Sequence, residues 1–235
     1  MYEVAIDGES LSLEGALAIA KGTATAYLPP RSREKMQLSR NAVETVVNSD
    51  EVIYGINTGF GALSSISIGK DDLEVLQTNL VRSHACGIGE RMDPELVLLM
   101  MITRANSLAK GVSGARPELV DQLISMVNSR IAPIVPRIGS LGASGDLAPL
   151  SHMALGMMGE GECQRFVSGE WNLADAAIAL AEANLDPIKL QAKEGLSLIN
   201  GTSQMCAYLT CTILNMETLS LAADASIACS LEAIK

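Results

Sequence analysis

The chain has 235 residues, of which 48% are hydrophobic and 19% charged, so it can bury a core and is not a disordered segment. Its net charge is −10, and no run of Lys or Arg provides the basic surface that nucleic acids or anionic membranes require. Aromatic residues make up only 3%, so we expect a core of aliphatic side chains and Met in closely packed helices.

Five cysteines are present, and none of them forms a C-x-x-C pair. We expect buried, reduced thiols in a cytoplasmic protein, and no zinc site, because the two histidines are far apart. The acidic N-terminus lacks the apolar stretch of a signal peptide, so no such leader is expected.

The first elements are predicted to be short and separated by breaks. Residues 2–6 suit a strand, and a helix should run from its N-cap, Ser12, to about residue 21, where Gly22 ends it. After two prolines a second helix is expected over residues 32–48. The segment 52–67 contains three Gly and several Ser and Thr without a helical period, so we interpret it as a loop, where functional residues are common.

Helices and turns then alternate up to residue 183. A β-hairpin is expected over residues 161–172 with Ser168-Gly169 as its turn, and Pro133 and Pro136 predict an irregular stretch before residue 146. Asp146 is the predicted N-cap of the helix that follows it. The predicted helices cover residues 71–86, 93–110, 117–130, 146–158 and 174–183.

The chain from about Thr202 to Lys235 predicts one long helix, since neither Gly nor Pro interrupts it. Apolar or small residues lie on nearly every side, so this helix should be buried all round. Earlier helices, other chains or a continuation of the chain beyond residue 235 would have to cover it. Polar residues interrupt every window of about 18 residues, so it is not expected to span a membrane. The overall prediction is a mainly α protein.

The run 139–162, GSLGASGDLAPLSHMALGMMGEGE, is the most unusual part of the sequence. In Ala143-Ser144-Gly145 the nitrogen of Gly145 can approach the carbonyl of Ala143, because glycine has no side chain, and the Ser144 hydroxyl can leave as water. Cyclisation would give a five-membered ring with an exocyclic methylidene, an electrophile that no ordinary side chain supplies. The plain alternative is a loop of small residues before a helix.

A serine hydrolase is a further alternative. The pattern G-x-S-x-G would need glycine at position 146, where Asp146 stands. Only His84 and His152 could act as the base, and His152 falls inside a predicted helix, where a packed side chain is the ordinary interpretation.

The same run resembles the signature of the aromatic amino acid ammonia-lyase family, in which Ala-Ser-Gly forms the methylidene-imidazolone (MIO) electrophile. Three further segments agree with that family in order and spacing: Tyr54 in YGINTGFG, His84 in LQTNLVRSHACGIG and Asn200 in KEGLSLINGTS. The resemblance covers nearly the whole chain. The Ser-His-Ala form around His84 looks like the histidine ammonia-lyase branch, although tyrosine ammonia-lyases can also carry His there.

The resemblance implies a role for each of these residues. The tripeptide Ala143-Ser144-Gly145 would form MIO autocatalytically, with no external cofactor and no metal. Tyr54 would take the β-proton of the substrate, for which the pKa of its phenol must be lowered. His84 would face the substrate side chain, and Asn200 would contact the electrophile or the substrate. Taken alone, each residue has an ordinary structural interpretation that comes first: Tyr54 as a half-buried aromatic residue, His84 as a packed core residue and Asn200 as a helix cap.

The implied reaction is elimination of ammonia from L-histidine to give trans-urocanate. The alternatives are a tyrosine ammonia-lyase, an aminomutase on the same scaffold, and a non-catalytic fragment or assembly subunit. The implied fold is mainly α. Residues 1–193 would form a helical domain that bears the MIO and a small β-hairpin, and residues 194–235 would begin a central helical bundle.

Family chains are roughly twice as long as this one, so the resemblance concerns their N-terminal half only. The other half supplies a second tyrosine, the arginine that pairs with the substrate carboxylate, a glutamine, and a glutamate associated with histidine specificity. Family sites lie where subunits of a tetramer meet. A homo-oligomer that binds a small amino acid is therefore expected, with no nucleic-acid or membrane partner.

Overall fold

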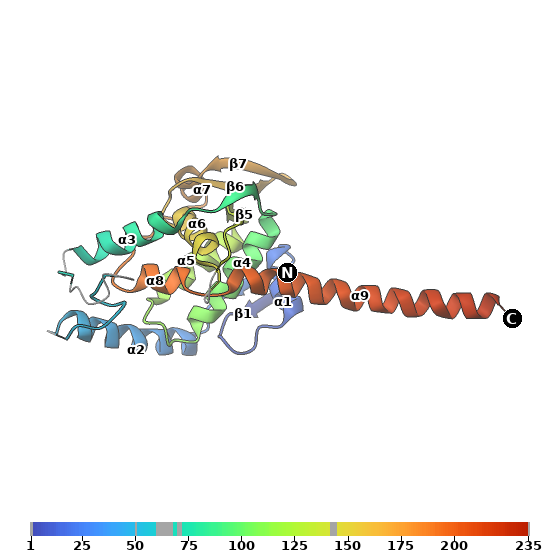
Figure 1. Ribbon diagram of the computed structural model, residues 1–235, viewed down its shortest axis with the longest axis horizontal. Coiled ribbons are helices and arrows are strands. Elements are labelled where there is room, and N and C mark those ends of the chain that lie inside the picture. Colours follow the sequence, from blue (N-terminus) through green and yellow to red (C-terminus); the bar gives the residue numbers. More distant parts are fainter. Residues whose placement is uncertain (1, 50, 60–67, 70–71, 142–144, 235) are drawn as a thin grey trace.

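A computed structural model of the chain describes residues 2–49, 51–59, 68–69, 72–141 and 145–234. The helices form a packed body with a β-hairpin at one edge, and one long helix, α9, extends from it (Figure 1). The protein is therefore mainly α, as the sequence predicted.

The N-terminal segment forms β1 (Tyr2–Ala5), α1 (Leu13–Ala20), β2 (Ala24–Tyr27) and α2 (Pro30–Val47). The predicted cap of the first helix is confirmed, because the Ser12 hydroxyl oxygen accepts a hydrogen bond of 3.0 Å from the Gly15 amide. Gly22 follows the helix with a φ of +73°, a conformation that favours glycine. The parallel pairing of β1 with β2 was not predicted, since a four-residue strand beside a turn carries little pattern.

The core is built around α4. The middle of the chain supplies α3 (Leu73–His84), α4 (Pro94–Ala109), α5 (Pro117–Asn128), α6 (Leu147–Met157) and α7 (Ala176–Glu182). In α4 ten of the sixteen residues are buried, because α1, α5 and α9 pack against it on different sides. Its predicted start is confirmed: the Asp93 carboxylate accepts a hydrogen bond of 2.9 Å from the Glu95 amide, and Pro94 occupies the first helical position.

Short strands connect the helices: β3 (Ile88–Arg91), β4 (Ile131–Pro133), β5 (Pro136–Ile138), β6 (Glu162–Val167) and β7 (Glu170–Asp175). The predicted hairpin is confirmed as β6–β7, with φ values of +54° at Ser168 and +91° at Gly169 in its turn. The stretch predicted to be irregular instead contains β4 and β5, which pair antiparallel with β6 and β3. Three residues are too few to show alternation in a sequence.

Two helices end the chain, the six-residue α8 (Glu194–Ile199) and the 31-residue α9 (Ser203–Ala233). The long helix is confirmed, but its buried residues all lie in the first two turns: Ser203, Gln204, Ala207 and Thr210. Of the three covers considered for this helix, the earlier helices do not supply one, because residues 215–234 extend beyond the body and are exposed (Figure 1). Five large apolar side chains in this part are 58–72% exposed: Met216, Leu219, Leu221, Ile227 and Leu231.

The five cysteines are free, but the expectation that all are buried is wrong. Cys163 is buried, and this burial raises the pKa of its thiol to about 12. Cys86, Cys206 and Cys229 are exposed, the last two on α9. Cys206 and Cys229 are exposed because the other described elements do not cover their positions on α9.

Candidate active site

Asp146 directly follows the tripeptide 143–145, and its carboxylate is fully buried. One oxygen, Oδ2, accepts hydrogen bonds from the amides of Gln204 at 2.7 Å and Met205 at 3.1 Å. The other, Oδ1, accepts one of 2.7 Å from the Ser140 hydroxyl. Asp146 therefore caps the N-terminus of α9 from outside that helix, where a negative charge is favoured.

The prediction that Asp146 is the N-cap residue of α6 is confirmed, but its side chain makes no capping hydrogen bond to that helix. Thr202, at the N-cap of α9, makes none either, so the first amides of α9 are available to the Asp146 carboxylate. A tertiary contact has replaced the local one that the sequence suggested.

Gly145 is the one member of the tripeptide that the structure describes; Ala143 and Ser144 lie outside the described residues. Gly145 is buried with a φ of +84°, and a Cβ atom there would collide with the Met205 side chain. The Leu141 amide donates a hydrogen bond of 2.6 Å to the Gly145 carbonyl, so the two sides of this loop are joined. The positive φ of Gly145 and its bond to Leu141 fit the close backbone approach that ring formation requires.

Tyr54 begins a turn that packs on α8. Its side chain is 58% exposed, and a Cβ atom at the neighbouring Gly55 would lie 2.8 Å from Leu196 Cδ2. Asn57 shapes the turn, since its side chain accepts a hydrogen bond of 2.8 Å from the Ile53 amide. Tyr54 therefore lies on a turn that the Asn57 side chain stabilises, and it is outside the core.

His84 is the last residue of α3 and is partly exposed. Its Nδ1 lies 2.9 Å from the Leu80 carbonyl oxygen and 3.1 Å from the Ser83 hydroxyl. A carbonyl can only accept, so this bond requires a hydrogen on Nδ1 and leaves Nε2 of the neutral ring as an acceptor.

Asn200 follows α8 as its C-cap residue and is exposed. Its backbone carbonyl accepts a hydrogen bond of 2.9 Å from Arg104 Nη2. The alternative interpretation as the cap of the next helix does not hold, because Asp146 caps α9.

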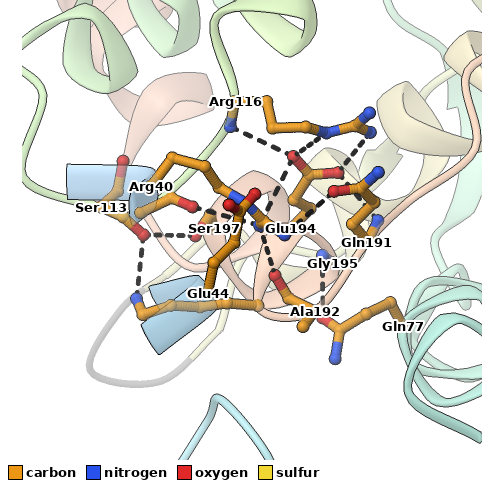
Figure 2. A network of polar contacts seen from close by, with 12 residues as sticks. Arg40, Glu44, Gln77, Ser113, Arg116, Gln191, Ala192, Glu194, Gly195 and Ser197 are labelled. Atoms are coloured by element: carbon orange, nitrogen blue, oxygen red, sulfur yellow. Dashed lines mark hydrogen bonds and ion pairs between the residues drawn. The ribbon is translucent and has the colours of Figure 1, made fainter. Parts of the chain in front are cut away.

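A network of polar contacts fixes the start of α8 (Figure 2). Glu194 is fully buried and accepts bonds of 2.8 Å from Nε and Nη2 of Arg116, one to each oxygen. The Arg116 amide at 3.1 Å and the Gln191 amide at 2.8 Å complete its partners, and Arg40 Nη1 lies 3.9 Å away. Burial would lower the pKa of Arg116, but the hydrogen bond and charge of Glu194 outweigh it, so the pKa is raised.

Gln77 connects α3 to the same helix. Its Oε1 accepts hydrogen bonds from the Gly195 amide at 2.9 Å and the Leu196 amide at 3.4 Å. The helix that ends at His84 is thereby held against the helix that ends at Asn200 (Figure 2).

The motif segments therefore meet around α8. The turn of Tyr54 packs on Leu196, α3 is bonded to α8 through Gln77, and the Asp146 amide donates a hydrogen bond of 3.2 Å to the Gly201 carbonyl. Sequence reasoning missed α8 itself and its anchors Glu194, Gln77 and Arg104. The one available signal was a charged Lys193-Glu194 pair inside an otherwise apolar stretch.

His152, the other base considered for a hydrolase, has a structural partner. Its Nε2 accepts a hydrogen bond of 3.1 Å from the Gly87 amide, and burial lowers the pKa of its ring. This contact holds the chain just after His84.

Other features of the described residues lie elsewhere. A groove of about 490 Å³ lies between α3 and residues 187–190 and is not lined by Tyr54, His84 or Asn200. Within the described ranges no group of three His, Cys, Asp or Glu side chains could hold a metal ion. Over the same ranges no helix combines the length and apolar character needed to cross a bilayer.

Comparison with known proteins agrees with this geometry. A family model, aromatic amino acid lyase, matches residues 11–235. The chain is 44% identical over 233 residues to a histidine ammonia-lyase of Alkaliphilus metalliredigens, which covers 99% of this chain and 45% of that protein. The chain therefore spans about half the length of the curated relatives it matches.

Solved structures show the same similarity. The crystal structure of histidine ammonia-lyase from Trypanosoma cruzi has a TM-score of 0.81 and 38% identity, over 91% of this chain and 40% of that chain. A tyrosine aminomutase from Streptomyces globisporus has a TM-score of 0.79 and the same 38% identity, over 88% of this chain and 38% of that chain. With a family model over residues 11–235 and a shared fold, the chain belongs to the aromatic amino acid lyase family.

Proposed function

We propose that this chain forms the electrophile-bearing part of an ammonia-lyase that converts L-histidine to trans-urocanate. The observation that carries the proposal is the junction at α8, where the Asp146 amide bonds to the Gly201 carbonyl and so joins the tripeptide segment to Asn200. The similarity to histidine ammonia-lyases supports the choice of substrate.

The tripeptide would supply the electrophile by an internal condensation. The Gly145 nitrogen bonds to the Ala143 carbonyl carbon, and the carbonyl oxygen leaves as water with the two amide hydrogens of residues 144 and 145. Ser144 then loses its hydroxyl and its α-hydrogen as a second water. The resulting methylidene would act as an electron sink for the departure of ammonia, which ordinary side chains do not offer. The fixed backbone at Gly145 and the bond between Leu141 and Gly145 fit this condensation.

The remaining residues would bind substrate and move a proton. The phenolic oxygen of Tyr54 would take the β-proton, which requires the tyrosinate form and an exposed position such as its turn provides. The Nε2 acceptor of His84 suits the N–H of a substrate imidazole. The amide of Asn200 would hold the substrate or the electrophile at the junction. We also propose a cytoplasmic homo-oligomer, in line with five free cysteines and the exposed α9.

A tyrosine aminomutase or tyrosine ammonia-lyase is the second candidate. The observation in its favour is the equal identity, 38%, to the solved histidine ammonia-lyase and the solved tyrosine aminomutase. His84 suits either ring, because an acceptor at Nε2 can also bind a phenolic hydroxyl. A non-catalytic assembly subunit is the third.

The test combines intact mass with an absorbance assay. The purified chain should be lighter than its sequence by the mass of two waters, and Ser144→Ala should remove that deficit because the leaving hydroxyl is gone. Where the chain shows turnover, near-ultraviolet absorbance with histidine, tyrosine and phenylalanine then identifies the substrate. Activity that persists in Ser144→Ala would overturn the proposal, and an undehydrated wild-type chain without turnover would favour the non-catalytic alternative.

A further inference from the structure

Arg104 is a charged residue that is only 5% exposed and lies inside the central helix α4. Its Nη2 donates hydrogen bonds to the Ser197 carbonyl and, at 2.9 Å, to the Asn200 carbonyl. These carbonyls belong to the last turn of α8, where a helix has acceptors without partners of its own and a positive charge is favoured. The arginine is therefore a tertiary cap of α8.

The opposite charge lies on the other side of the same junction. Asp146 caps the N-terminus of α9, which starts three residues after Asn200. Burial lowers the pKa of Arg104 to about 10, and the attraction of the Asp146 carboxylate offsets part of the lowering. The guanidinium thus stays charged at neutral pH despite its burial, and the segment around Asn200 has a buried cation and a buried anion near it.

Gly201 makes this arrangement possible. A Cβ atom at Gly201 would collide with the Arg104 guanidinium, so the arginine lies directly against the backbone next to Asn200. From the other side, the Asp146 amide donates to the Gly201 carbonyl. The backbone at the junction is held on both sides by groups from α4 and from the segment before α6.

A purely packing role would not need a charge here. Burying a guanidinium is unfavourable unless most of its donors are used, and Arg104 Nε has no partner among the described residues. Meanwhile α8 has six residues, too few to be stable as an isolated helix. The position of its end must come from tertiary contacts, and Arg104 supplies the charged contacts at that end.

We propose that Arg104 is a positioning residue, which sets where the Asn200 amide lies relative to Gly145. The functional meaning of that position rests on the proposed function, because Asn200 acts there on the substrate or electrophile. That Arg104 sets the position of the Asn200 amide does not depend on the proposed function. The experiment therefore measures this position first and turnover second.

The experiment compares Arg104→Lys and Arg104→Met with Arg33→Met, a matched control. Arg33 is half-exposed and pairs with Asp121 at 2.6 Å on the surface. The readout is the nuclear magnetic resonance signal of the Asn200 side-chain amide in the 235-residue chain, assigned by its loss in Asn200→Ala. The side-chain amide of Asn172, in the β6–β7 hairpin, is the internal reference. Thermal melting verifies that each variant is folded.

Arg104→Met should displace or broaden the Asn200 signal while leaving that of Asn172 in place. Arg104→Lys should cause a smaller change, because an ammonium keeps the charge but cannot bind both carbonyls as a planar fork does. Arg33→Met should change neither signal. An unchanged Asn200 signal in folded Arg104→Met overturns the proposal, and if that variant does not fold, an unchanged signal in Arg104→Lys overturns it.

Mass and turnover keep the two proposals separate. A wild-type chain whose mass lacks the two-water deficit contradicts the proposed function. The Asn200 signal then still tests whether Arg104 positions Asn200. Where wild-type turnover is measurable, Arg104→Lys should lower kcat by on the order of 10- to 100-fold with KM nearly unchanged, because a small misplacement of a reacting group acts mainly on the chemical step. A change confined to KM contradicts this expectation.

Discussion

At the residue scale, the ring nitrogens of the two histidines have different surroundings. His84 uses Nδ1 for the Leu80 carbonyl and presents Nε2 at a partly exposed helix end. His152 uses Nε2 for the Gly87 amide inside the body. Nε2 of His84 can accept a hydrogen bond from a ligand, whereas Nε2 of His152 accepts one from within the fold.

Replacing His84 by Phe should therefore change specificity. The ring volume is largely kept, but the Nε2 acceptor is lost, so turnover of histidine should fall relative to that of phenylalanine. One hydrogen bond contributes about 0.5–1.5 kcal/mol, a factor of roughly two to ten in the ratio of kcat/KM. The measurement is that ratio for wild type and His84→Phe. Equal losses on both substrates would make His84 a structural residue.

His152 should make stability depend on pH. Burial lowers the pKa of its ring below the usual 6.5, so the folded protein keeps the neutral ring that accepts from Gly87. As the pH falls through about 6.5, the unfolded chain takes up a proton before the folded chain does. The unfolded state then binds more protons, and the free energy of unfolding decreases, by at most about 1.4 kcal/mol per pH unit from one group.

Carboxylates also titrate as the pH falls, so the effect of His152 needs a comparison. His152→Gln keeps an acceptor for the Gly87 amide but does not titrate. Urea unfolding between about pH 7 and pH 5.5 should show a steeper loss in wild type than in His152→Gln. An equal decrease in the free energy of unfolding with pH for wild type and His152→Gln would show that the pKa of His152 is not lowered.

At the element scale, the helices that the sequence predicted well are those with local signals. Ser12 and Asp93 cap their helices, and the Ser168-Gly169 turn forms the hairpin, because the information lies within a few residues. The elements that were missed depend on distant partners. β4 and β5 are three residues long, and α8 is six, so neither the alternation of a strand nor the period of a helix can be recognised in their sequences.

The candidate site divides in the same way. Residue types and motifs indicated Tyr54, His84, the tripeptide and Asn200, and their assigned roles stay predictions. The anchors Glu194, Gln77 and Arg104 act through contacts more than 75 positions apart, which one sequence does not reveal. Asp146 was predicted at its correct N-cap position, but the bond of its carboxylate to Gln204, 58 positions away, was not predicted. The division at residues 193 and 194 also stays a prediction.

Glu194 should contribute strongly to stability through α8. In Glu194→Gln the partly buried Arg116 loses its counter-charge and the buried Arg40 keeps only that of Glu44, and breaking a buried pair typically costs about 3–5 kcal/mol. Glu44→Gln is the matched control, because Glu44 pairs with the same Arg40 but its side chain is 50% exposed, and such pairs contribute up to about 1 kcal/mol. Denaturant unfolding of both variants measures the difference. A loss in Glu194→Gln no larger than that in Glu44→Gln would contradict the assigned contribution of the network.

At the scale of the whole molecule, α9 determines how the chain behaves in solution. Its outer part exposes Met216, Leu219, Leu221, Ile227 and Leu231, and each Å² of apolar surface covered is worth about 25 cal/mol. Covering several hundred Å² would therefore gain several kcal/mol, comparable to the stability of a whole domain.

The isolated chain should therefore self-associate through α9 or be poorly soluble. Sedimentation velocity should show oligomers in wild type, and Leu219→Lys with Leu231→Lys should shift the chain toward monomers. Val112→Lys is the control, because Val112 is 80% exposed but lies between α4 and α5. The chain alone should also turn over histidine very slowly or not at all, since it spans 45% of the relative. A compact monomer with normal lyase activity would contradict both expectations.

The contacts of Asp146 give α9 a further significance. The helix is about 47 Å long at 1.5 Å per residue, and its first amides bond to the residue that directly follows the tripeptide. Sliding or rotating α9 would stretch these bonds, so whatever fixes its outer half also restricts the backbone at Gly145. Such a thermodynamic coupling is reciprocal. Whatever restrains the backbone at Gly145 therefore restrains α9 through the same bonds of Asp146.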